Sequence, residues 1–323
     1  MSRLKVLIIG CGNIAGGFDM DRPEAADSPL THAGGYVADG RFELSACVEP
    51  DDSKREAFMR TWGIPLGFRS IDEVPKWQHR FDVISVCSPT ERHPDDLEVC
   101  IETEPKVIFC EKPVTMSALR TAGVIKQCNE AKVSLAVNYT RRWDPMISTL
   151  ADGMREGRWG TLRSVVGFYN KGLLNNGSHM LDLLQLILGP LEFIKAGQPV
   201  DDYLPHDPSV PVWLQGAGCC PIQLSCGHAS DFAFFELQLV FSEAVVSMEN
   251  GGMFWRERVP VDSHEFKGFR VLDEGSRKPG GYSKAMIRAC SNIFEFVSHD
   301  RPLASTGETA LVSQQLCELI RHT

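Results

Sequence analysis

Three places in this chain hold residue types that could carry chemistry at the spacing in which they occur. Gly10 and Gly12 follow an apolar run near the N-terminus, Glu111 and Lys112 follow another in VIFCEKP, and His179 precedes a third in SHMLDLL. Closely spaced glycines let a backbone approach a phosphate. A lysine among apolar neighbours can hold an ammonium against a substrate oxygen, and a histidine can exchange a proton near neutral pH.

The glycines belong to the motif GCGNIA, in which Gly10, Gly12 and Ala15 give the pattern G-x-G-x-x-A around Asn13 and Ile14. At the end of a strand and the head of a helix, this pattern makes the tight turn that brings a pyrophosphate to the helix N-terminus. A plain glycine-rich turn would show the same letters. The apolar run before the motif and an acid after the next run favour dinucleotide binding.

That acid is Glu49, which ends the run FELSACVE, with Asp51 two residues further on. A carboxylate there accepts hydrogen bonds from the adenosine ribose hydroxyls and repels a 2′-phosphate. We therefore expect NAD as the cofactor, while the nearby Arg55 leaves NADP open. Glu49 lies much farther beyond the glycines than the usual ~20 residues.

The excess is an insert at residues 16–30, GGFDMDRPEAADSPL. Its acidic residues are Asp19, Asp21, Glu24 and Asp27, against the single base Arg22. The insert is either a solvated surface loop or a lid near the cofactor, and the sequence leaves both interpretations open.

The first part of the chain alternates between strand and helix patterns. Apolar runs at residues 5–10, 43–49, 82–89, 106–113 and 134–139 have the length and continuous apolarity of strands covered on both faces. Helical patterns lie at residues 51–63 and 117–132, the latter with Ser117 as an N-cap. This alternation predicts a doubly wound parallel sheet, whose ligands bind at the carboxyl ends of the strands. Lys112 is therefore expected at the ligand edge.

From about residue 160 the pattern changes to longer alternating runs rich in aromatic and β-branched residues, such as DFAFFELQLVFSE. Such alternation predicts an antiparallel sheet with one covered face. We expect an α/β chain with a dinucleotide-binding domain at 1–120 and an α+β domain with an open, mainly antiparallel sheet at 121–323. Because DFAFFELQLVF would put several aromatic side chains on the open face, a homodimer or homotetramer is expected.

His179 follows the stretch GLLNNG, which predicts a loop holding Asn175 and Asn176 before a helix that ends at Gly189 and Pro190. A helix N-terminus disfavours an imidazolium, so His179 is expected to be a neutral base. Asp182 shares its helix face and could orient the ring. A capping histidine on an apolar helix explains the spacing equally simply, and spacing alone favours that interpretation.

Composition narrows the class of protein. A net charge of −9 and a pI near 5.5 argue against a nucleic-acid partner. No apolar stretch approaches the ~20 residues of a membrane span and no signal peptide is recognisable, so no membrane partner and a cytoplasmic location are expected. The eleven cysteines are expected to be reduced thiols. The cluster CCPIQLSCGH lacks zinc-ligand spacing, and no metal is expected.

Taken in order, G-x-G-x-x-A, CSPTERH, CEKP, VNYTRRWDP, NNGSHMLDLL and STGETAL resemble the motifs of the Gfo/Idh/MocA oxidoreductase family. The resemblance runs through nearly the whole chain and implies a Rossmann domain followed by an open sheet. It also implies that Lys112 lies beside the nicotinamide, with a Lys–Pro bond that is commonly cis, and that His179 is the catalytic histidine. The family often has an aspartate where this chain has Asn175, so an Asp–His relay is not expected. Some relatives that act on nucleotide-linked sugars carry Asn there.

The resemblance assigns further residues to the site. Those implied to line the cofactor are Ser88, Pro89, His93 and Glu111, and those implied to meet substrate are Asn138, Arg142 and Asp144, together with Asn175 and His179. The expected function is an NAD(P)-dependent oxidoreductase that acts on a carbinol or keto group of a sugar, nucleotide sugar or cyclitol. Two alternatives remain: an NAD-dependent glycosidase that oxidises its substrate transiently, and a non-catalytic, dinucleotide-sensing regulatory protein. The presence of both Lys112 and His179 argues against the non-catalytic alternative.

Overall fold

The computed structural model describes residues 3–22, 26–74 and 81–322. Its residues form two compact units, one made of Met1–Trp143 with Ser283–Val312 and the other of Asp144–Tyr282 with Ser313–Thr323. The chain therefore leaves the first unit later than the boundary expected at residue 120, because the strand at residues 134–137 still pairs within the first sheet. It also returns to each unit near its C-terminus.

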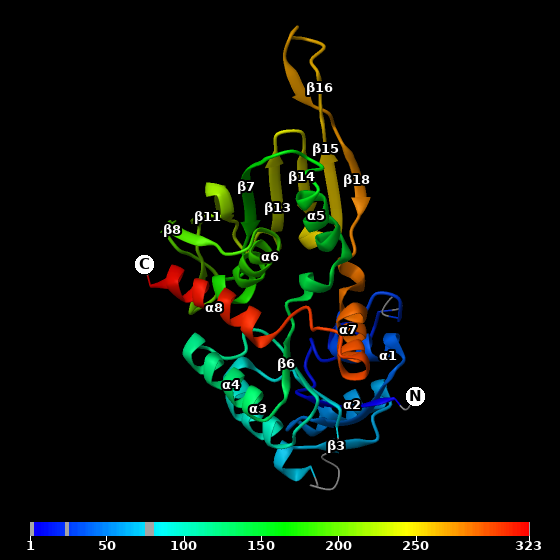
Figure 1. Cartoon of the computed structure of the whole chain (residues 1–323). Helices are drawn as coiled ribbons and strands as arrows, with labels where there is room; N and C mark the ends of the chain where they lie inside the picture. The colour runs from blue at the N-terminus through cyan, green and yellow to red at the C-terminus, as the bar shows by residue number, and fades with distance from the viewer. Residues whose placement is uncertain (1–2, 23–25, 75–80, 323) are drawn as a thin grey trace. The chain divides into compact units, whose positions relative to one another are not determined.

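The first unit is built on a six-stranded parallel sheet in the order β3-β2-β1-β4-β5-β6 (Figure 1). Its strands are β1 (Leu4–Ile9), β2 (Phe42–Val48), β3 (Leu66–Phe68), β4 (Val83–Val86), β5 (Val107–Cys110) and β6 (Ser134–Val137). The strand order reverses between β1 and β4, which is where such sheets bind ligands. All four residues of β4 and of β5 are buried, as continuous apolar runs predict. The doubly wound sheet is confirmed.

Helices cover both faces of this sheet. They are α1 (His32–Asp39), α2 (Asp52–Trp62), α3 (His93–Glu102), α4 (Ala118–Glu130) and α7 (Ala285–His299), with short 3₁₀ turns η1 (Gly17–Asp19), η3 (Ile71–Glu73), η5 (Thr90–Arg92) and η6 (Thr140–Trp143). Ser117 caps α4 as predicted, accepting a hydrogen bond from the Arg120 amide. Because α7 packs against α1, a segment near the C-terminus completes the N-terminal core.

The second unit contains an eight-stranded sheet in the order β18-β15-β14-β13-β7-β12-β11-β8. Only β7 and β12 pair in parallel, and the other neighbours are antiparallel. Its strands are β7 (Leu162–Tyr169), β8 (Glu192–Ala196), β11 (Val212–Gln215), β12 (Pro221–Cys226), β13 (Phe235–Phe241), β14 (Val245–Glu249), β15 (Phe254–Arg258) and β18 (Ser276–Pro279). Two hairpins stand beside it, β9 (Val200–Leu204) with β10 (Asp207–Ser209), and β16 (Pro260–Asp262) with β17 (Arg270–Leu272). The expected fold class is confirmed.

One face of this sheet packs on α5 (Pro145–Arg155), α6 (Ser178–Leu188) and the last turns of α8 (Gly307–Arg321). The remaining helical turns are η7 (Leu173–Gly177), η8 (Ala217–Cys219), η9 (Asn250–Gly252) and η10 (Tyr282–Lys284). The expectation of several aromatic side chains on the open face fails within β13, because Phe235 and Phe241 point into the core and are 7% and 6% exposed, whereas Phe232, just before the strand, is 65% exposed. Strand alternation instead turns Glu236, Gln238 and Val240 outward.

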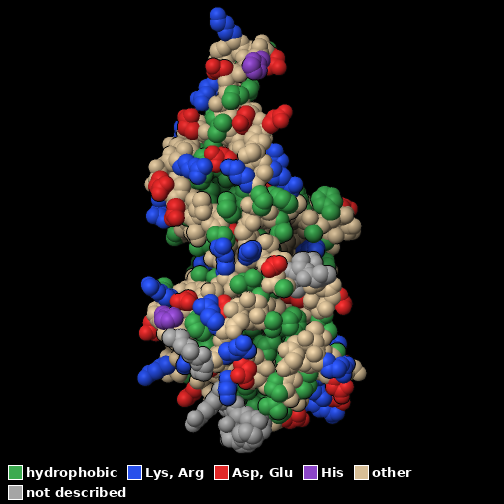
Figure 2. All heavy atoms as spheres, turned by 90° about the vertical axis from the view of Figure 1, so that its right-hand side faces the viewer, with side chains coloured by type: hydrophobic (Ala, Val, Ile, Leu, Met, Phe, Trp, Pro, Cys, Tyr) green, Lys and Arg blue, Asp and Glu red, His purple; other side chains and the backbone are tan. Residues whose placement is uncertain are grey.

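Among the described residues, no helix is both long and apolar enough to cross a bilayer. On the face drawn in Figure 2, acidic and basic side chains are intermixed.

The contact between α1 and α7 gives a test of the first unit. A Cβ on Gly35 would lie 2.9 Å from the Cys290 sulfur and 3.1 Å from the Met286 carbonyl oxygen, whereas one on Gly123 in α4 would meet nothing within 4 Å. We expect Gly35→Val to lower the free energy of unfolding by ~1–3 kcal/mol through overpacking. Gly123→Val should change it by only about 0.5 kcal/mol. Equal urea midpoints for the two variants would contradict this packing.

Candidate functional site

The glycine loop lies where β1 and β4 end side by side. Gly10 has φ +82°, and a Cβ there would lie 2.6 Å from the Ser88 nitrogen. Only glycine therefore fits, and the loop can run directly against the end of β4. Gly12 and Asn13 are exposed beyond it, as a ligand-binding loop requires. Ile14 is half-buried against the core of the first unit.

The loop does not open a regular helix directly, and α1 begins only at His32, after the insert. A helical turn follows instead, with Gly16 donating to the Gly12 carbonyl, before the short η1. The chain then comes back: the His32 amide donates to the Ile14 carbonyl at 3.1 Å and the Ala33 amide to the Ala15 carbonyl at 2.8 Å. The insert therefore separates the loop from α1 in sequence but not in space. This explains why Glu49 lies so many residues beyond the glycines.

Asp19 fastens the described part of the insert. Its carboxylate is buried and accepts hydrogen bonds from the Leu30 and Thr31 amides, the Thr31 hydroxyl and the Arg22 guanidinium. Glu24 lies outside the described residues. The ends of the insert are thus tied together by one side chain, and its role as a lid stays a prediction.

A cavity of about 340 Å³ opens beside the glycine loop. It is lined by Cys11, Gly12, Asn13, Gly17, Met20, Lys54, Ala57 and Phe58. The insert supplies Gly17 and Met20, and the first turns of α2 supply Lys54 and Ala57. A cavity bounded by a glycine loop and carrying one ammonium suits a phosphate-bearing ligand.

Glu49 reaches back to the same loop. Its carboxylate accepts hydrogen bonds from the Cys11 amide at 3.0 Å and the Asp51 amide at 3.1 Å. Arg55 instead donates to the Glu49 carbonyl oxygen and forms an ion pair with Asp52. The hydrogen bond to Asp52 and the negative charge of that carboxylate raise the pKa of Arg55. The acid is therefore the group that faces the loop, and the base is held by a neighbouring carboxylate.

The ends of β4 and β5 are joined by His93. Its ring is buried and contacts the Ser88 carbonyl at 2.9 Å and the Pro113 carbonyl at 3.1 Å. The Ser88 hydroxyl donates to Asp96, and Pro89 is exposed at the start of η5. His93 thus positions both loops, while direct contact with a cofactor stays a prediction.

Glu111 is the centre of a buried hydrogen-bond chain. It accepts hydrogen bonds from Asn138 at 2.6 Å and contacts the His32 ring at 3.0 Å. The other nitrogen of His32 lies 3.1 Å from the Ser85 hydroxyl, which lies 2.8 Å from the Tyr36 hydroxyl. Burial alone would raise the pKa of Glu111, but these hydrogen bonds and the positive charge of Lys112 lower it below the usual value. The carboxylate is therefore held ionised.

Sequence reasoning missed His32, Ser85 and Tyr36. The signal available was their spacing, since His32 and Tyr36 are four residues apart on α1 and so share a helix face. Ser85 is the one polar side chain in the apolar run of β4.

Lys112 follows β5 at the carboxyl edge of the sheet, as predicted, and is half-buried. The Lys112–Pro113 peptide bond is cis, as the resemblance implied. Glu111 and Asn138 lie at this same edge, so these three predicted site residues are brought together. Arg142 follows them in η6 and donates to the Ala304 carbonyl at 3.3 Å.

In the second unit the predicted loop before His179 is wrong. Leu173–Gly177 form a turn of π-helix, η7, that leads straight into α6. The carboxylate of Asp207 on β10 causes this, because it accepts the Leu174 and Asn175 amides at 2.8 Å each and so caps the turn. His179 therefore lies inside a longer helical segment, and the argument from a helix N-terminus no longer applies to it. Such π turns often occur at functional sites.

The polar residues around this turn are largely bonded to backbone. Asn175 donates to the Lys171 carbonyl and Asn176 to the Asn170 carbonyl, both at 2.9 Å. Asp182 is buried and accepts a hydrogen bond from Ser313, so its proposed role in orienting His179 stays a prediction. Asp144 caps α5 by accepting the Met146 amide at 2.8 Å.

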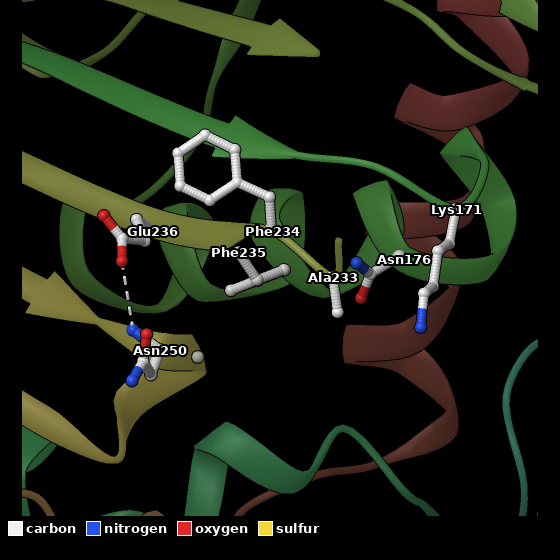
Figure 3. A pocket seen from close by; sticks show the side chains of 8 residues that line it. Lys171, Asn176, Ala233, Phe234, Phe235, Glu236 and Asn250 are labelled. Carbon is white, nitrogen blue, oxygen red and sulfur yellow. Dashed lines mark hydrogen bonds between the residues drawn. The ribbon is translucent and has the colours of Figure 1, made fainter. Parts of the chain in front are cut away.

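A cavity of about 350 Å³ lies beside η7. Its lining residues, shown in Figure 3, are Lys171, Asn176, Ala233, Phe234, Phe235, Glu236, Asn250 and Gly251. Lys171 and Asn176 lie at one end, and Glu236 and Asn250 at the other (Figure 3). Two charges and two amides around phenyl rings fit a small polar ligand.

The family model described as "Oxidoreductase family, NAD-binding Rossmann fold" (GFO_IDH_MocA) matches residues 4–139. These residues belong to the Gfo/Idh/MocA family. The predicted family and the dinucleotide cofactor are thereby confirmed. An inositol 2-dehydrogenase from Rhizobium meliloti is 28% identical over 134 residues, covering 42% of this chain and 39% of the relative. The chain spans less than half the length of each curated relative that it matches.

Solved structures extend the likeness to the fold of the whole chain. An oxidoreductase from Agrobacterium radiobacter, in complex with NAD⁺, L-tartaric acid and magnesium, has a TM-score of 0.75 at 15% identity. The WlbA dehydrogenase from Bordetella pertussis, in complex with NADH and UDP-GlcNAcA, has a TM-score of 0.76 at 16% identity. Each alignment covers 99% of this chain and 96% of the other. At these identities the likeness concerns the fold.

In the second unit, the cysteine cluster shows no metal-binding geometry. Cys219 is exposed, Cys220 is buried and Cys226 is half-buried. Within the described ranges, no three His, Cys, Asp or Glu side chains are grouped so that they could hold a metal ion.

The turn at Gly172 gives a test of the π-helical geometry. Gly172 has φ +86°, and a Cβ there would lie 2.3 Å from the Asp207 carboxylate, whereas Gly218 has φ +65° with open space around it. Gly218→Ala should lower the free energy of unfolding by about 1 kcal/mol, through backbone strain alone. Gly172→Ala should cost at least ~2 kcal/mol, because it also displaces the cap. Urea unfolding that shows the same loss for both would mean that Asp207 does not hold this turn.

Proposed function

We propose that this chain is an NAD(P)-dependent oxidoreductase, with a preference for NAD(H), that interconverts a carbinol and a keto group on a sugar, nucleotide sugar or cyclitol. The observation that carries the proposal is the half-buried Lys112 beside the ionised Glu111, at the sheet edge that also holds the glycine loop. A purely structural strand end has no need of a largely buried carboxylate next to an ammonium, since both must be partly desolvated.

The first unit fits a dinucleotide. Gly10 permits close approach of a ligand to the end of β4, and Gly12 and Asn13 are exposed at the mouth of the cavity. Lys54 offers an ammonium to phosphate oxygens and Glu49 offers carboxylate oxygens to ribose hydroxyls. When bound, the nicotinamide accepts or supplies the hydride.

The chain's own residues handle the substrate oxygen and its proton. Lys112 donates a hydrogen bond to the carbinol or carbonyl oxygen and stabilises negative charge that develops on it. His179 takes the hydroxyl proton during oxidation and returns it during reduction. Asn175 lacks an acidic proton and orients the substrate rather than relaying a proton. Glu111 acts through Lys112, since it balances the ammonium charge without touching substrate.

The substrate class rests on the relatives. The names of the matched proteins include inositol 2-dehydrogenases and a D-xylose 1-dehydrogenase, and one structural neighbour binds UDP-GlcNAcA. We assign cofactor binding to the first unit and substrate binding to the second, with Asn138, Arg142 and Asp144 as further substrate contacts. A homodimer or homotetramer and a cytoplasmic location remain predictions.

The catalytic assignment is tested on a substrate found by screening sugars and cyclitols for NADH formation. Lys112→Met should lower kcat by at least ~10²-fold, because it removes the charge that faces the oxygen, and should leave NAD⁺ affinity within a few-fold. His179→Ala should lower kcat by ~10²–10⁴-fold.

The matched control is Lys106→Met, at the opposite end of β5, where the lysine pairs with Asp82 at 3.2 Å on the surface. It should retain full turnover. Near-normal turnover of Lys112→Met would refute the assignment. Substrate consumed with no net NADH, and cofactor surviving purification, would support the glycosidase alternative.

Cofactor preference is tested by titrating NAD⁺ and NADP⁺ against tryptophan fluorescence. Glu49 lies at the loop while Arg55 is paired with Asp52, so NADP⁺ should bind at least ~10-fold more weakly, equivalent to about 1.4 kcal/mol. Glu49→Gln should narrow that ratio by removing the negative charge. Tighter binding of NADP⁺ to the native protein would show that Glu49 does not select the cofactor.

A further inference from the structure

The cavity beside η7 contains two opposite charges that the proposed hydride chemistry does not use. Lys171 and Asn176 stand at one end, and Glu236 and Asn250 at the other, with Ala233 and Phe234 between them (Figure 3). A cavity of about 350 Å³ lies at the small end of the range for ligand sites. It therefore suits a single compact polar molecule.

The structure holds Lys171 in an unfavourable backbone conformation. Its φ is +68°, which is uncommon for a residue with a side chain. The Asp202 carboxylate accepts the Lys171 amide at 2.7 Å, and Gly172 follows with a second positive φ. Such strained conformations cluster at ligand sites. The hydrogen bond to Asp202 thus fixes the backbone here, so the Lys171 side chain projects from a fixed position.

The ammonium of Lys171 lies 5.7 Å from the centre of the Tyr203 ring. Across the described ranges of the chain, Lys171 forms no ion pair with a carboxylate. An aromatic face steadies a cation without neutralising it. The positive charge is therefore available to an anion in the cavity.

The opposite end is built to accept hydrogen bonds. One oxygen of Glu236 accepts a hydrogen bond from the backbone N–H of Asn250 at 3.3 Å. The carboxylate keeps further acceptor capacity. Between the ends, the Phe234 ring stacks on Phe168 with their centres 5.2 Å apart. This part of the lining is apolar, as suits the carbon face of a sugar or cyclitol ring.

We propose that this cavity binds the substrate as a carboxylate-bearing polyhydroxy compound, that is, a sugar acid. Lys171 and the second N–H of the Asn176 side-chain amide donate to the carboxylate, and Glu236 accepts hydrogen bonds from hydroxyl groups at the other end. One ammonium and one amide match a monoanion. A phosphate dianion would bring a second negative charge into a cavity that already contains Glu236. This inference rests on the proposed function, since it names the substrate of that same enzyme.

The test is calorimetric titration of the NAD⁺-loaded full chain with D-glucuronate, D-gluconate, D-glucose and D-glucose 6-phosphate. At least one of the two acids should bind at least ~10-fold more tightly than glucose and than the phosphate. Lys171→Met should remove that advantage and leave glucose binding unchanged. Lys171→Arg should restore much of it, which a merely structural lysine would not require.

Lys195→Met is the matched control, because Lys195 also lies over an aromatic ring, with its ammonium 4.6 Å from the centre of Trp213. It should retain the preference for acids. Equal binding of acids and glucose, tighter binding of the phosphate, no binding of either acid, or an unaltered preference in Lys171→Met would each overturn the proposal.

The outcomes separate this inference from the proposed function. Turnover of a neutral sugar that depends on Lys112, with no preference for acids, would leave the oxidoreductase standing and remove the sugar-acid site. Selective acid binding that depends on Lys171, without any NADH formation, would support the site and remove the dehydrogenase. Thermal melting of each variant identifies any loss of binding that comes from unfolding.

Discussion

The largely buried carboxylate of Glu111, at the end of β5, is the group on which the first unit's chemistry depends. Glu111 leaves the sheet into a region that excludes most water, so its charge must be balanced by the protein. His32 comes from α1, Asn138 from the residue after β6, and Lys112 from the adjacent position, and all three meet this one side chain. Since α1 follows the insert, the hydrogen bonds of Ile14 and Ala15 that return the chain to the glycine loop also set the position of His32. The loop and the lysine are therefore parts of one arrangement.

A second carboxylate has the same role in the second unit, by a different route. Asp207 takes the amides of Leu174 and Asn175 and so converts what would be a loop into a helical turn. Gly172 must be a glycine because that carboxylate occupies the place of its side chain. In each unit, then, a polar site is positioned by an acid that is fully engaged with its neighbours. The hydrophobic cores make each unit rigid, and the two carboxylates set the positions of the side chains and turns around them.

Local patterns were sufficient to predict much of this structure. The continuous apolarity of β4 and β5, the alternation in β13, the Ser117 cap and the end of α6 at Gly189 all depend on residues close together in sequence. The π turn could not be predicted, because its cap is Asp207, more than 30 residues away along the chain. The bonding of His32 to Glu111 spans 79 residues and leaves no periodic signal. The return of the chain from the insert to the glycine loop likewise depends on contacts distant in sequence, among them those of Asp19 with Leu30 and Thr31.

The assignment of α7 to the first unit has a consequence for synthesis of the chain. Its side chains Met286, Ala289, Cys290 and Ile293 fill the core beside α1 and β2. A ribosome delivers them only after all of the residues that form the large antiparallel sheet have been made. Until then, the apolar surface that α7 covers beside α1 and β2 is exposed, although the six strands of the sheet are already complete. The nascent chain therefore carries exposed apolar surface through more than a hundred residues of elongation, the condition in which chaperones act.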